Sequence, residues 1–177
     1  NRIKSPSPRV LEAKQYVLYN LGANDFSNGR VSAALDFFTR ARKLGDYNNG
    51  VKADCAMWIG ECQYKLGKYK SAISAYKTYL AENKNKNNDN LWNTNYGIAY
   101  CHFQQKNYEQ ARKLFEKVTA SNSRLSSMAK ADAYNRIGDT YYYAKDYANA
   151  ERYYGIALTN NASAGDYSLY QEAMMSG

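Results

Sequence analysis

Residues 133–158, which read AYNRIGDTYYYAKDYANAERYYGIAL, carry the pattern that decides the fold. A small residue, Gly138, precedes Ala150 by twelve positions, and Tyr154 and Ala157 follow Ala150 at the fourth and seventh positions. Side chains at i, i+4 and i+7 lie along one stripe of an α-helix. The stretch therefore predicts two helices, the first with a small residue near its middle and the second with an aromatic residue on its buried stripe.

The same columns occur four times along the chain, 38 or 39 residues apart. The three earlier copies place a small residue, an alanine, an aromatic residue and a fourth side chain at matching positions: Gly22, Ala34, Phe38 and Ala41; Gly60, Ala72, Tyr76 and Tyr79; Ala99, Ala111, Phe115 and Val118. A fixed period of this size indicates an array of helical repeats. Antiparallel helices approach most closely where Gly or Ala lies at the crossing, so we expect the aromatic residue to fill the gap beside it.

Local signals mark the ends of these helices. Ser7 before Pro8 predicts an N-cap followed by proline at the first helical position, and Gly45 predicts a helix C-terminus. Asp89 and Asp166 are expected to cap the first helices of the third and fifth repeats. Breaks at 28–29, 66–68 and 144–146 separate the two helices of a repeat.

The composition fits a helix-rich binding protein better than an enzyme. Of the 177 residues, 45% are hydrophobic and 15% aromatic, and 19 are tyrosines. Lys and Arg number 24 against 16 Asp and Glu, which gives a formal net charge of +8. No run of about 18 apolar residues occurs, so no membrane-spanning helix is predicted. Cys55, Cys62 and Cys101 fall in apolar helical surroundings and are expected to be buried thiols.

Little in the sequence supports catalysis, a cofactor or a metal ion. His102 is the only histidine, and it directly follows Cys101, so the two side chains do not face each other on a helix. Asp132 and Asp139 lie two turns apart on one helix, about 10 Å from each other, which is too far to share a proton. No phosphate-binding glycine loop or paired-cysteine motif occurs. We therefore predict a protein with no enzymatic activity, cofactor or metal site.

The repeated columns resemble the tetratricopeptide repeat. The fourth repeat resembles it throughout and the second, around Gly60 and Ala72, is nearly as close, whereas the third has Ala99 and Val118 in place of glycine and alanine. The resemblance implies an all-α fold, a right-handed α-solenoid of antiparallel helix pairs. It covers residues 9–177 as one array after an extension of residues 1–8, with repeats at about 9–46, 47–85, 86–124 and 125–163 and a partial fifth repeat, a single helix, at 166–176.

Members of this family bind an extended or helical peptide on a concave face lined by the first helix of each repeat. Carried over by position, the resemblance implies a groove formed by Tyr16, Tyr19, Asp54, Met57, Glu61, Asn93, Tyr96, Tyr100, Asn135, Asp139 and Tyr142, with Ala23, Phe26, Tyr64, Lys65, Phe103, Gln104, Asp132 and Tyr143 beside them. Tyrosine suits such a surface because it combines a rigid apolar ring with a hydrogen-bonding tip. Aromatic and acidic residues together favour a basic or neutral peptide.

These residues also have a plainer interpretation. The rings of Tyr64, Phe103 and Tyr142 are expected to pack between repeats rather than face a ligand, and acidic residues on a helix commonly form a solvated face. The family's chaperone-binding members grip a terminal carboxylate with basic residues on the first helices. At the matching positions only Arg136 is suitably basic, so we do not expect such a clamp.

Two other functions stay open at this point. Much of the basic excess is expected on the second helices or their approaches, as Arg40, Arg42, Lys43, Lys68, Lys70, Lys77, Arg112, Lys113 and Lys117. A basic, tyrosine-rich array could bind nucleic acid through phosphate contacts and stacking, but the charges are dispersed, so nucleic acid is the less favoured partner. The array could instead be a structural spacer or assembly platform in a larger envelope protein.

A second, less specific likeness concerns the compartment. The chain is similar to the Tyr- and Asn-rich repeat proteins of Bacteroidetes cell envelopes, which favours the periplasm or cell envelope over the cytoplasm. An apolar face on the terminal helix, formed by Leu169, Ala173 and Met174, could also drive homodimer formation, since terminal repeats normally need polar caps.

Overall fold

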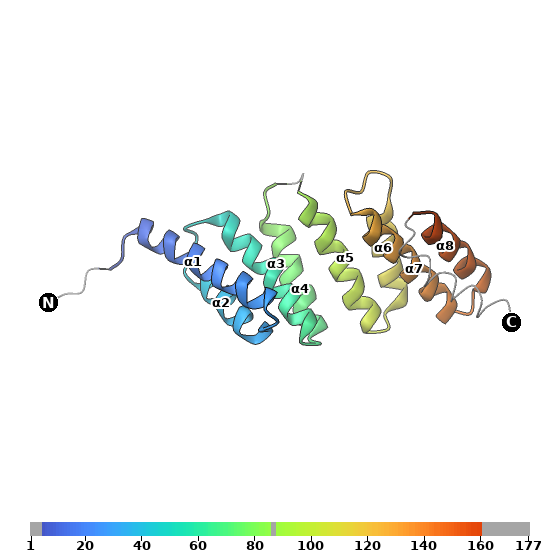
Figure 1. Cartoon of the computed structure of the whole chain (residues 1–177), viewed down its shortest axis with the longest axis horizontal. Helices are drawn as coiled ribbons and strands as arrows, with labels where there is room; N and C mark the ends of the chain where they lie inside the picture. Colours follow the sequence, from blue (N-terminus) through green and yellow to red (C-terminus); the bar gives the residue numbers. More distant parts are fainter. Residues whose placement is uncertain (1–4, 86–87, 161–177) are drawn as a thin grey trace. The chain divides into compact units, whose positions relative to one another are not determined.

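A computed structural model of the chain describes residues 5–85 and 88–160 (Figure 1). The regular structure within these residues is entirely helical, as the sequence predicts. The helices are α1 (Pro8–Ser27), α2 (Val31–Lys43), α3 (Asn49–Lys65), α4 (Tyr69–Glu82), α5 (Asp89–Gln104), α6 (Tyr108–Thr119), α7 (Ser127–Tyr143) and α8 (Tyr147–Asn160).

The chain forms two compact units, here called the N-terminal unit (residues 1–86, with α1–α4) and the C-terminal unit (residues 87–177, with α5–α8). Each unit contains two helix pairs, α1/α2 and α3/α4 in the first and α5/α6 and α7/α8 in the second. The second helix of one pair then packs on the first helix of the next, α2 on α3 and α6 on α7. Helix pairs stacked in this way form the α-solenoid class of fold.

The glycine of the first helix lies directly against the tyrosine of the second in the second and fourth repeats. A Cβ atom added to Gly60 would come within 2.5 Å of the Tyr76 ring, and one added to Gly138 within 2.5 Å of the Tyr154 ring. Both rings are buried. These separations are far shorter than van der Waals contact, so only glycine permits the helices to cross this closely.

The first and third repeats use phenylalanine at the same point. A Cβ atom added to Gly22 would lie 2.8 Å from the Phe38 ring. Ala99 and Phe115 are both fully buried in the core cluster of the C-terminal unit. The expectation that a small residue lies beside an aromatic residue is therefore confirmed in both units.

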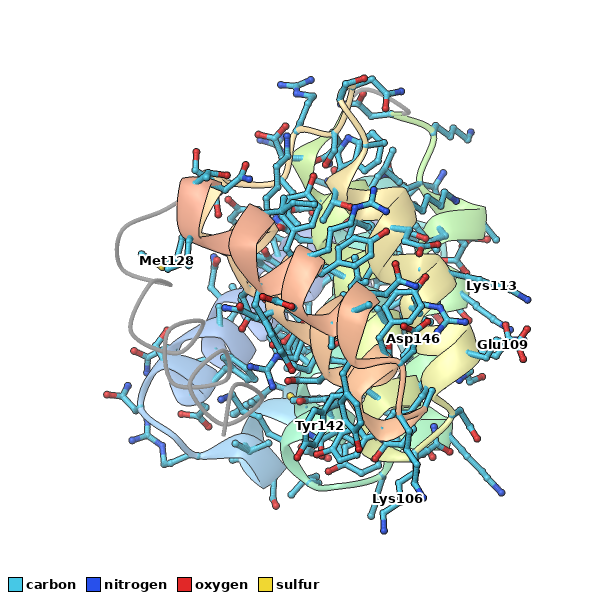
Figure 2. The ribbon with its side chains drawn as sticks, turned by 90° about the vertical axis from the view of Figure 1, so that its right-hand side faces the viewer. Lys106, Glu109, Lys113, Met128, Tyr142 and Asp146 are labelled. Carbon is cyan, nitrogen blue, oxygen red and sulfur yellow. The ribbon has the colours of Figure 1, made fainter. Side chains whose placement is uncertain are left out.

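The turn between the two helices of each repeat contains one residue with a left-handed backbone. The φ angle is 75° at Gly29, 71° at Gly67, 62° at Lys106 and 61° at Lys145. Glycine adopts this conformation at little steric cost, whereas the Cβ atom of lysine makes it strained. Lys106 projects away from the helices at its turn (Figure 2). The N-terminal unit thus uses glycine at this position and the C-terminal unit uses lysine.

The sequence predicts the caps of two helix starts within the described residues, and the structure confirms that of α1 but not that of α5. The Ser7 hydroxyl accepts a hydrogen bond from the Val10 backbone N–H at 3.4 Å, as expected of an N-cap. Asp89, the expected cap of α5, is instead its first residue, and Asn88 caps the helix by accepting from the Asn90 backbone N–H at 2.9 Å. The prediction is wrong by one residue, and Asp89 lies in the first turn, where a negative charge interacts favourably with the helix dipole.

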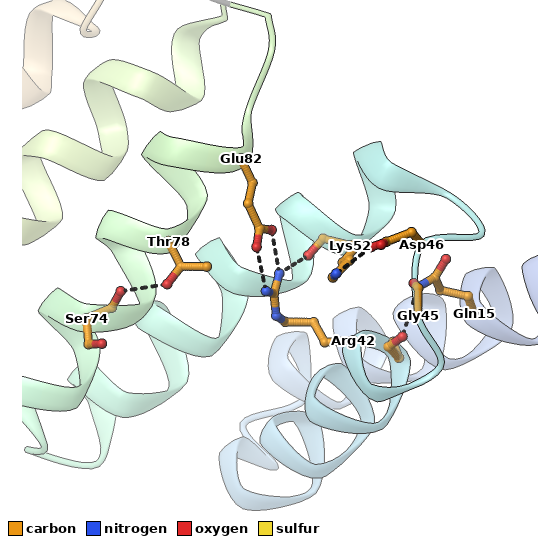
Figure 3. Close-up of polar contacts among 9 residues, drawn as sticks. Gln15, Arg42, Gly45, Asp46, Lys52, Ser74, Thr78 and Glu82 are labelled. Atoms are coloured by element: carbon orange, nitrogen blue, oxygen red, sulfur yellow. Dashed lines mark hydrogen bonds and ion pairs between the residues drawn. The ribbon is translucent and has the colours of Figure 1, made fainter.

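A buried amide joins the first two repeats. Gln15 of α1 is fully buried, and its Nε2 donates to the carbonyl oxygens of Ala41 at 2.9 Å and Gly45 at 3.0 Å. Its Oε1 accepts from the Asn48 backbone N–H at 2.8 Å. Gln15 and Gly45 lie side by side in Figure 3. A single side chain therefore binds both the end of α2 and the start of α3.

The predicted C-terminal features lie outside the described residues. These are the partial fifth repeat at 166–176, its cap Asp166, and the dimer face of Leu169, Ala173 and Met174. Within the part of the chain that the structure does describe, no helix is long and apolar enough to cross a membrane.

Candidate functional site

The tyrosines predicted for the groove of the N-terminal unit lie together on α1. Tyr16 is 54% exposed, and Tyr19 is half-buried with its ring centroid 6.4 Å from that of Tyr16. The Trp58 indole N–H of α3 donates to the Tyr19 hydroxyl at 3.3 Å. Burial raises the pKa of Tyr19, and the charge of Asp54 raises it further. The two tyrosines therefore form an accessible aromatic surface that extends toward α3.

Asp54 of α3 is the distinctive charge on this surface. It is half-buried, and no hydrogen bond or ion pair to it occurs among residues 5–85 and 88–160. Burial is the cause that raises its pKa above the usual range. Met57 of the same helix is also half-buried. We call Tyr16, Tyr19, Asp54 and Met57 the first-helix face of the N-terminal unit.

Two of the predicted acidic residues bind tyrosines of the same repeat. The Tyr76 hydroxyl donates to Glu61 at 2.7 Å, and the Tyr154 hydroxyl donates to Asp139 at 2.8 Å. In each case the carboxylate directly follows the glycine under the tyrosine ring. Burial raises the pKa of Glu61, and the hydrogen bond from Tyr76 partly opposes this. These carboxylates take part in the packing of their own helix pair.

Sequence reasoning missed this pairing, although a signal for it exists. Where the second helix has tyrosine, the residue after the small one is Glu61 or Asp139. Where it has phenylalanine, that residue is Ala23 or Tyr100. The acid and the aromatic hydroxyl thus occur together, fifteen residues apart in both repeats.

The acidic residue Asp132 of α7 is engaged by three side chains of the C-terminal unit. It accepts a hydrogen bond from the Tyr96 hydroxyl at 2.6 Å and another from the Tyr100 hydroxyl. Arg136 Nε lies 3.6 Å from Asp132 Oδ1, and Arg136 Nη1 lies 2.8 Å from Asp139 Oδ2. The one basic candidate for a carboxylate clamp is thus already bound to two acids. The pKa values of both tyrosines are raised, first by burial and then by the charge of Asp132.

The remaining groove residues are placed in different ways. Asn93 is exposed on α5, whereas Asn135 is 2% exposed on α7. Tyr142 is half-buried and packs edge-on against the rings of Tyr143 and Tyr147. Binding of a peptide by these residues stays a prediction.

Aromatic residues beside the predicted groove also contact neighbours in their own unit. In the N-terminal unit, the Phe26 ring lies 5.1 Å from Trp58, centroid to centroid, and that of Tyr64 lies 5.6 Å from Tyr69. In the C-terminal unit, Phe103 packs against several aromatic rings, of which Tyr108 lies 5.5 Å away. Packing of this kind supplies part of each core.

The cysteines and the possible metal-binding side chains offer little support for catalysis. Cys55, Cys62 and Cys101 are all buried and form no disulfide. Burial raises the pKa values of Cys55 and Cys62 to about 12, and a protonated thiol is a poor nucleophile. In the described part of the chain, no group of His, Cys, Asp and Glu is arranged to hold a metal ion.

Part of the basic excess on the second helices is neutralised locally. Arg40 pairs with Asp36 at 3.2 Å in the N-terminal unit. In the C-terminal unit Lys113 pairs with Glu109 at 2.7 Å, both on the exposed side of α6 (Figure 2). Arg112 stacks over the Tyr141 ring, 4.4 Å from its centroid. The two ion pairs reduce the charge available for a continuous phosphate-binding stripe, and the ring contact holds the Arg112 guanidinium against the protein.

The helix pairs and their glycine crossings match a known family. Models described as Tetratricopeptide repeat match residues 19–88 and 91–161, which together make up most of the chain. The chain is a tetratricopeptide repeat protein. Tetratricopeptide repeats generally form non-catalytic scaffolds for protein–protein interaction, and the all-α repeat fold of this chain agrees with that class.

Solved structures also resemble this tetratricopeptide repeat protein. BtubC from P. vanneervenii matches with a TM-score of 0.73 and 15% identity, over 93% of this chain and 68% of that one. PilF from Pseudomonas aeruginosa matches with a TM-score of 0.70 and 16% identity, over 93% of this chain and 68% of that one. YrrB, described as a TPR protein with an unusual peptide-binding site, matches with a TM-score of 0.71 and 19% identity. The match covers 90% of this chain and 74% of that one. At these identities the likeness concerns the fold alone. No curated protein sequence matches the chain.

Proposed function

We propose that this tetratricopeptide repeat protein is a non-catalytic scaffold that binds a basic peptide segment on the first-helix face of the N-terminal unit. The observation that carries the proposal is Asp54, a half-buried carboxylate with no partner in the described structure. A lysine or arginine of a bound segment would neutralise it. The rings of Tyr16 and Tyr19 lie on the same face and offer cation–π and apolar contact to the same side chain.

The corresponding acids of the C-terminal unit support this choice of unit. Asp132 and Asp139 are already bound by tyrosine hydroxyls and by Arg136. Because their charges are compensated within the fold, a basic ligand would gain less by approaching them. Asp54 has no such compensation, so we assign the basic segment to the N-terminal unit.

A labelled lysine-rich peptide tests the proposal on the full chain, with a glutamate-rich peptide of equal length as the reference. Fluorescence anisotropy should show saturable binding of the lysine-rich peptide only. Asp54→Asn, which keeps the size of the side chain, should weaken binding about tenfold, the size of one charge-assisted hydrogen bond. Asp36→Asn, on the exposed side of α2, removes an equal charge outside the face and should leave binding unchanged. Equal binding by both variants would contradict the assignment, and so would equal binding of the two peptides.

The pH dependence of the same binding gives an independent prediction. Burial raises the pKa of Asp54 in the folded chain, so the fold holds this proton more tightly than the unfolded chain does. Stability from this group therefore falls as the pH rises through its raised pKa, and Asp54→Asn should raise the free energy of unfolding at neutral pH. Binding of the lysine-rich peptide should weaken as the pH falls through the same pKa, at a higher pH than an ordinary aspartate would give. A pH profile identical in the Asn variant would contradict this prediction.

A further inference from the structure

The side of the N-terminal unit that carries α2 and α4 has a hollow of about 340 Å³. Ala56 and Ile59 of α3 form part of its lining, together with Arg42 of α2. The α4 side is formed by small side chains, namely Ser71, Ser74, Ala75 and Thr78. Thr78 donates its hydroxyl hydrogen to the Ser74 carbonyl of its own helix at 3.1 Å. We call this hollow the outer groove.

An ion pair fixes the helices on either side of the outer groove. Arg42 binds Glu82 through both terminal nitrogens, at 2.8 and 2.9 Å, and also donates to the Lys52 carbonyl at 2.6 Å (Figure 3). The pair raises the pKa of Arg42 and lowers that of Glu82, so both side chains are charged at neutral pH. The bridge links the C-terminal ends of α2 and α4, which gives the groove a defined width.

The matching position in the C-terminal unit is filled by the chain's own aromatic side chains. The second and fourth repeats align with a constant offset of 78 residues, which pairs Ala56 with Tyr134 and Ala75 with Tyr153. The Tyr134 and Tyr153 rings stack with centroids 6.4 Å apart. The Tyr134 hydroxyl donates to the Thr119 carbonyl at 3.3 Å. The outer groove is therefore a place where this fold accommodates protein aromatic rings.

The charges beside the groove differ in the same way between the two repeats. Lys70 and Lys77 lie one turn before and one turn after Ser74 on α4, so all three share one side of the helix. No ion pair involving either lysine occurs within the described residues. In the fourth repeat the corresponding residues are Ala148 and Gly155. The lysines thus accompany the groove that lacks its own aromatic filling.

We propose that the outer groove binds an acidic segment of a partner protein and receives an aromatic side chain from it. The ring would lie over Ala56 and Ala75, where Tyr134 and Tyr153 lie in the other unit, while acidic residues beside it would meet Lys70 and Lys77. A second copy of this chain is a poorer occupant because each copy carries a formal net charge of +8. This surface is separate from the first-helix face, and the two proposals stand or fall independently.

The probe is a labelled peptide of glutamate and glycine with one central tyrosine, added to the full chain. We expect saturable binding with shift changes in the ¹H–¹⁵N spectrum at Ala56 and Ala75. The double variant Ser74→Arg/Ala75→Tyr gives α4 the residues of the filled repeat and should weaken binding at least tenfold. Ser32→Arg/Ala33→Tyr makes the same changes at exposed positions of α2 and should leave binding unchanged.

Two further arms separate the ring from the charge. Replacing the tyrosine of the probe by alanine should abolish most of the binding, and Lys70→Ala/Lys77→Ala should weaken it several-fold and reduce its salt dependence. Asp54→Asn should have no effect. The proposal is overturned by absence of binding, by equal binding to the filled variant, or by equal binding of the peptide without tyrosine. Preferential binding of an oligothymidine strand at the groove would also overturn it, and so would self-association that the filled variant abolishes.

Discussion

The second and fourth repeats have the same buried contacts and different outer surfaces. In both, a glycine lies under a tyrosine ring and the tyrosine hydroxyl binds the carboxylate after the glycine. On the outside, Ala56 and Ala75 of α3/α4 leave the outer groove open, whereas Tyr134 and Tyr153 of α7/α8 stack on each other. The helix pair forms with either surface, so the outer positions are free to differ without loss of the repeat.

The largest effect is expected from disrupting what the two repeats share. Gly60→Ala and Gly138→Ala should each lower the free energy of unfolding by about 3 kcal/mol, because the new methyl group would overlap a buried tyrosine ring. Urea unfolding followed by circular dichroism measures this. Gly155→Ala is the matched control, since a Cβ atom there meets nothing within 4 Å, and it should stabilise α8 by about 1 kcal/mol. Similar changes in all three variants would refute the close crossing.

A smaller effect is expected from making the fourth repeat resemble the second on its outside. Tyr134→Ala/Tyr153→Ala should cost about 2 kcal/mol, since both rings are half-buried and stacked. Tyr134→Phe/Tyr153→Phe keeps the rings and should cost less than half as much in the same urea titration. If the alanine variant were as stable as the wild type, the packing of the two tyrosine rings would contribute nothing to the stability of the fold.

The hydrogen bonds from tyrosine hydroxyls to Asp139 and Glu61 should differ in their contribution to stability, with the more buried one contributing more. Tyr154→Phe should cost about 1–2 kcal/mol because Asp139 is only 5% exposed. Tyr76→Phe should cost less, because Glu61 is more accessible. The Tyr76 hydrogen bond holds down the pKa that burial raises, so its removal should raise the pKa of Glu61 in an NMR titration. The reverse ranking, or a lower pKa, would count against this description.

The smallest effect concerns the turns. Lys106→Gly and Lys145→Gly should each raise the free energy of unfolding by about 0.5 kcal/mol. Glycine relieves the strain of the positive φ angle, and its greater loss of conformational entropy on folding offsets part of that gain. Gly67→Lys should lower it by a similar amount in the N-terminal unit. Thermal unfolding measures whether each variant is more or less stable than the wild type. A stabilising effect of Gly67→Lys would show that a lysine is not strained in the left-handed turn.

The fold was predictable because its determinants recur. Gly60, Tyr76 and their counterparts are the positions that packing holds constant, and repetition makes such positions visible in one sequence. The glycine crossing follows directly from helix geometry, as does the break before each second helix. The cap of α5 was misplaced by one residue because Asn88 and Asp89 are both good capping residues.

The surfaces were less predictable because their residues lie at positions that differ from one repeat to the next. Family position places Glu61 and Asp139 in the groove, and their contact with a ligand stays a prediction. It carries no information about their hydrogen bonds to Tyr76 and Tyr154, which form only where the helices cross. The outer groove was missed for a related reason. Alanine at Ala75 is unremarkable by itself, and it becomes informative only when the fourth repeat shows a tyrosine at the same place.

The amide of Gln15 has a consequence for how far the chain can be shortened. The Gln15 side chain meets the end of α2 and the start of α3 together, through three hydrogen bonds with backbone atoms. Hydrolysis of this amide to a carboxylate would place a negative charge against two carbonyl oxygens and remove the donor that both require. Ageing by deamidation would therefore loosen the junction on which the first two repeats depend while every residue of the first-helix face stays chemically intact. Trimming past α1 would remove Gln15 together with Tyr16 and Tyr19 of that face.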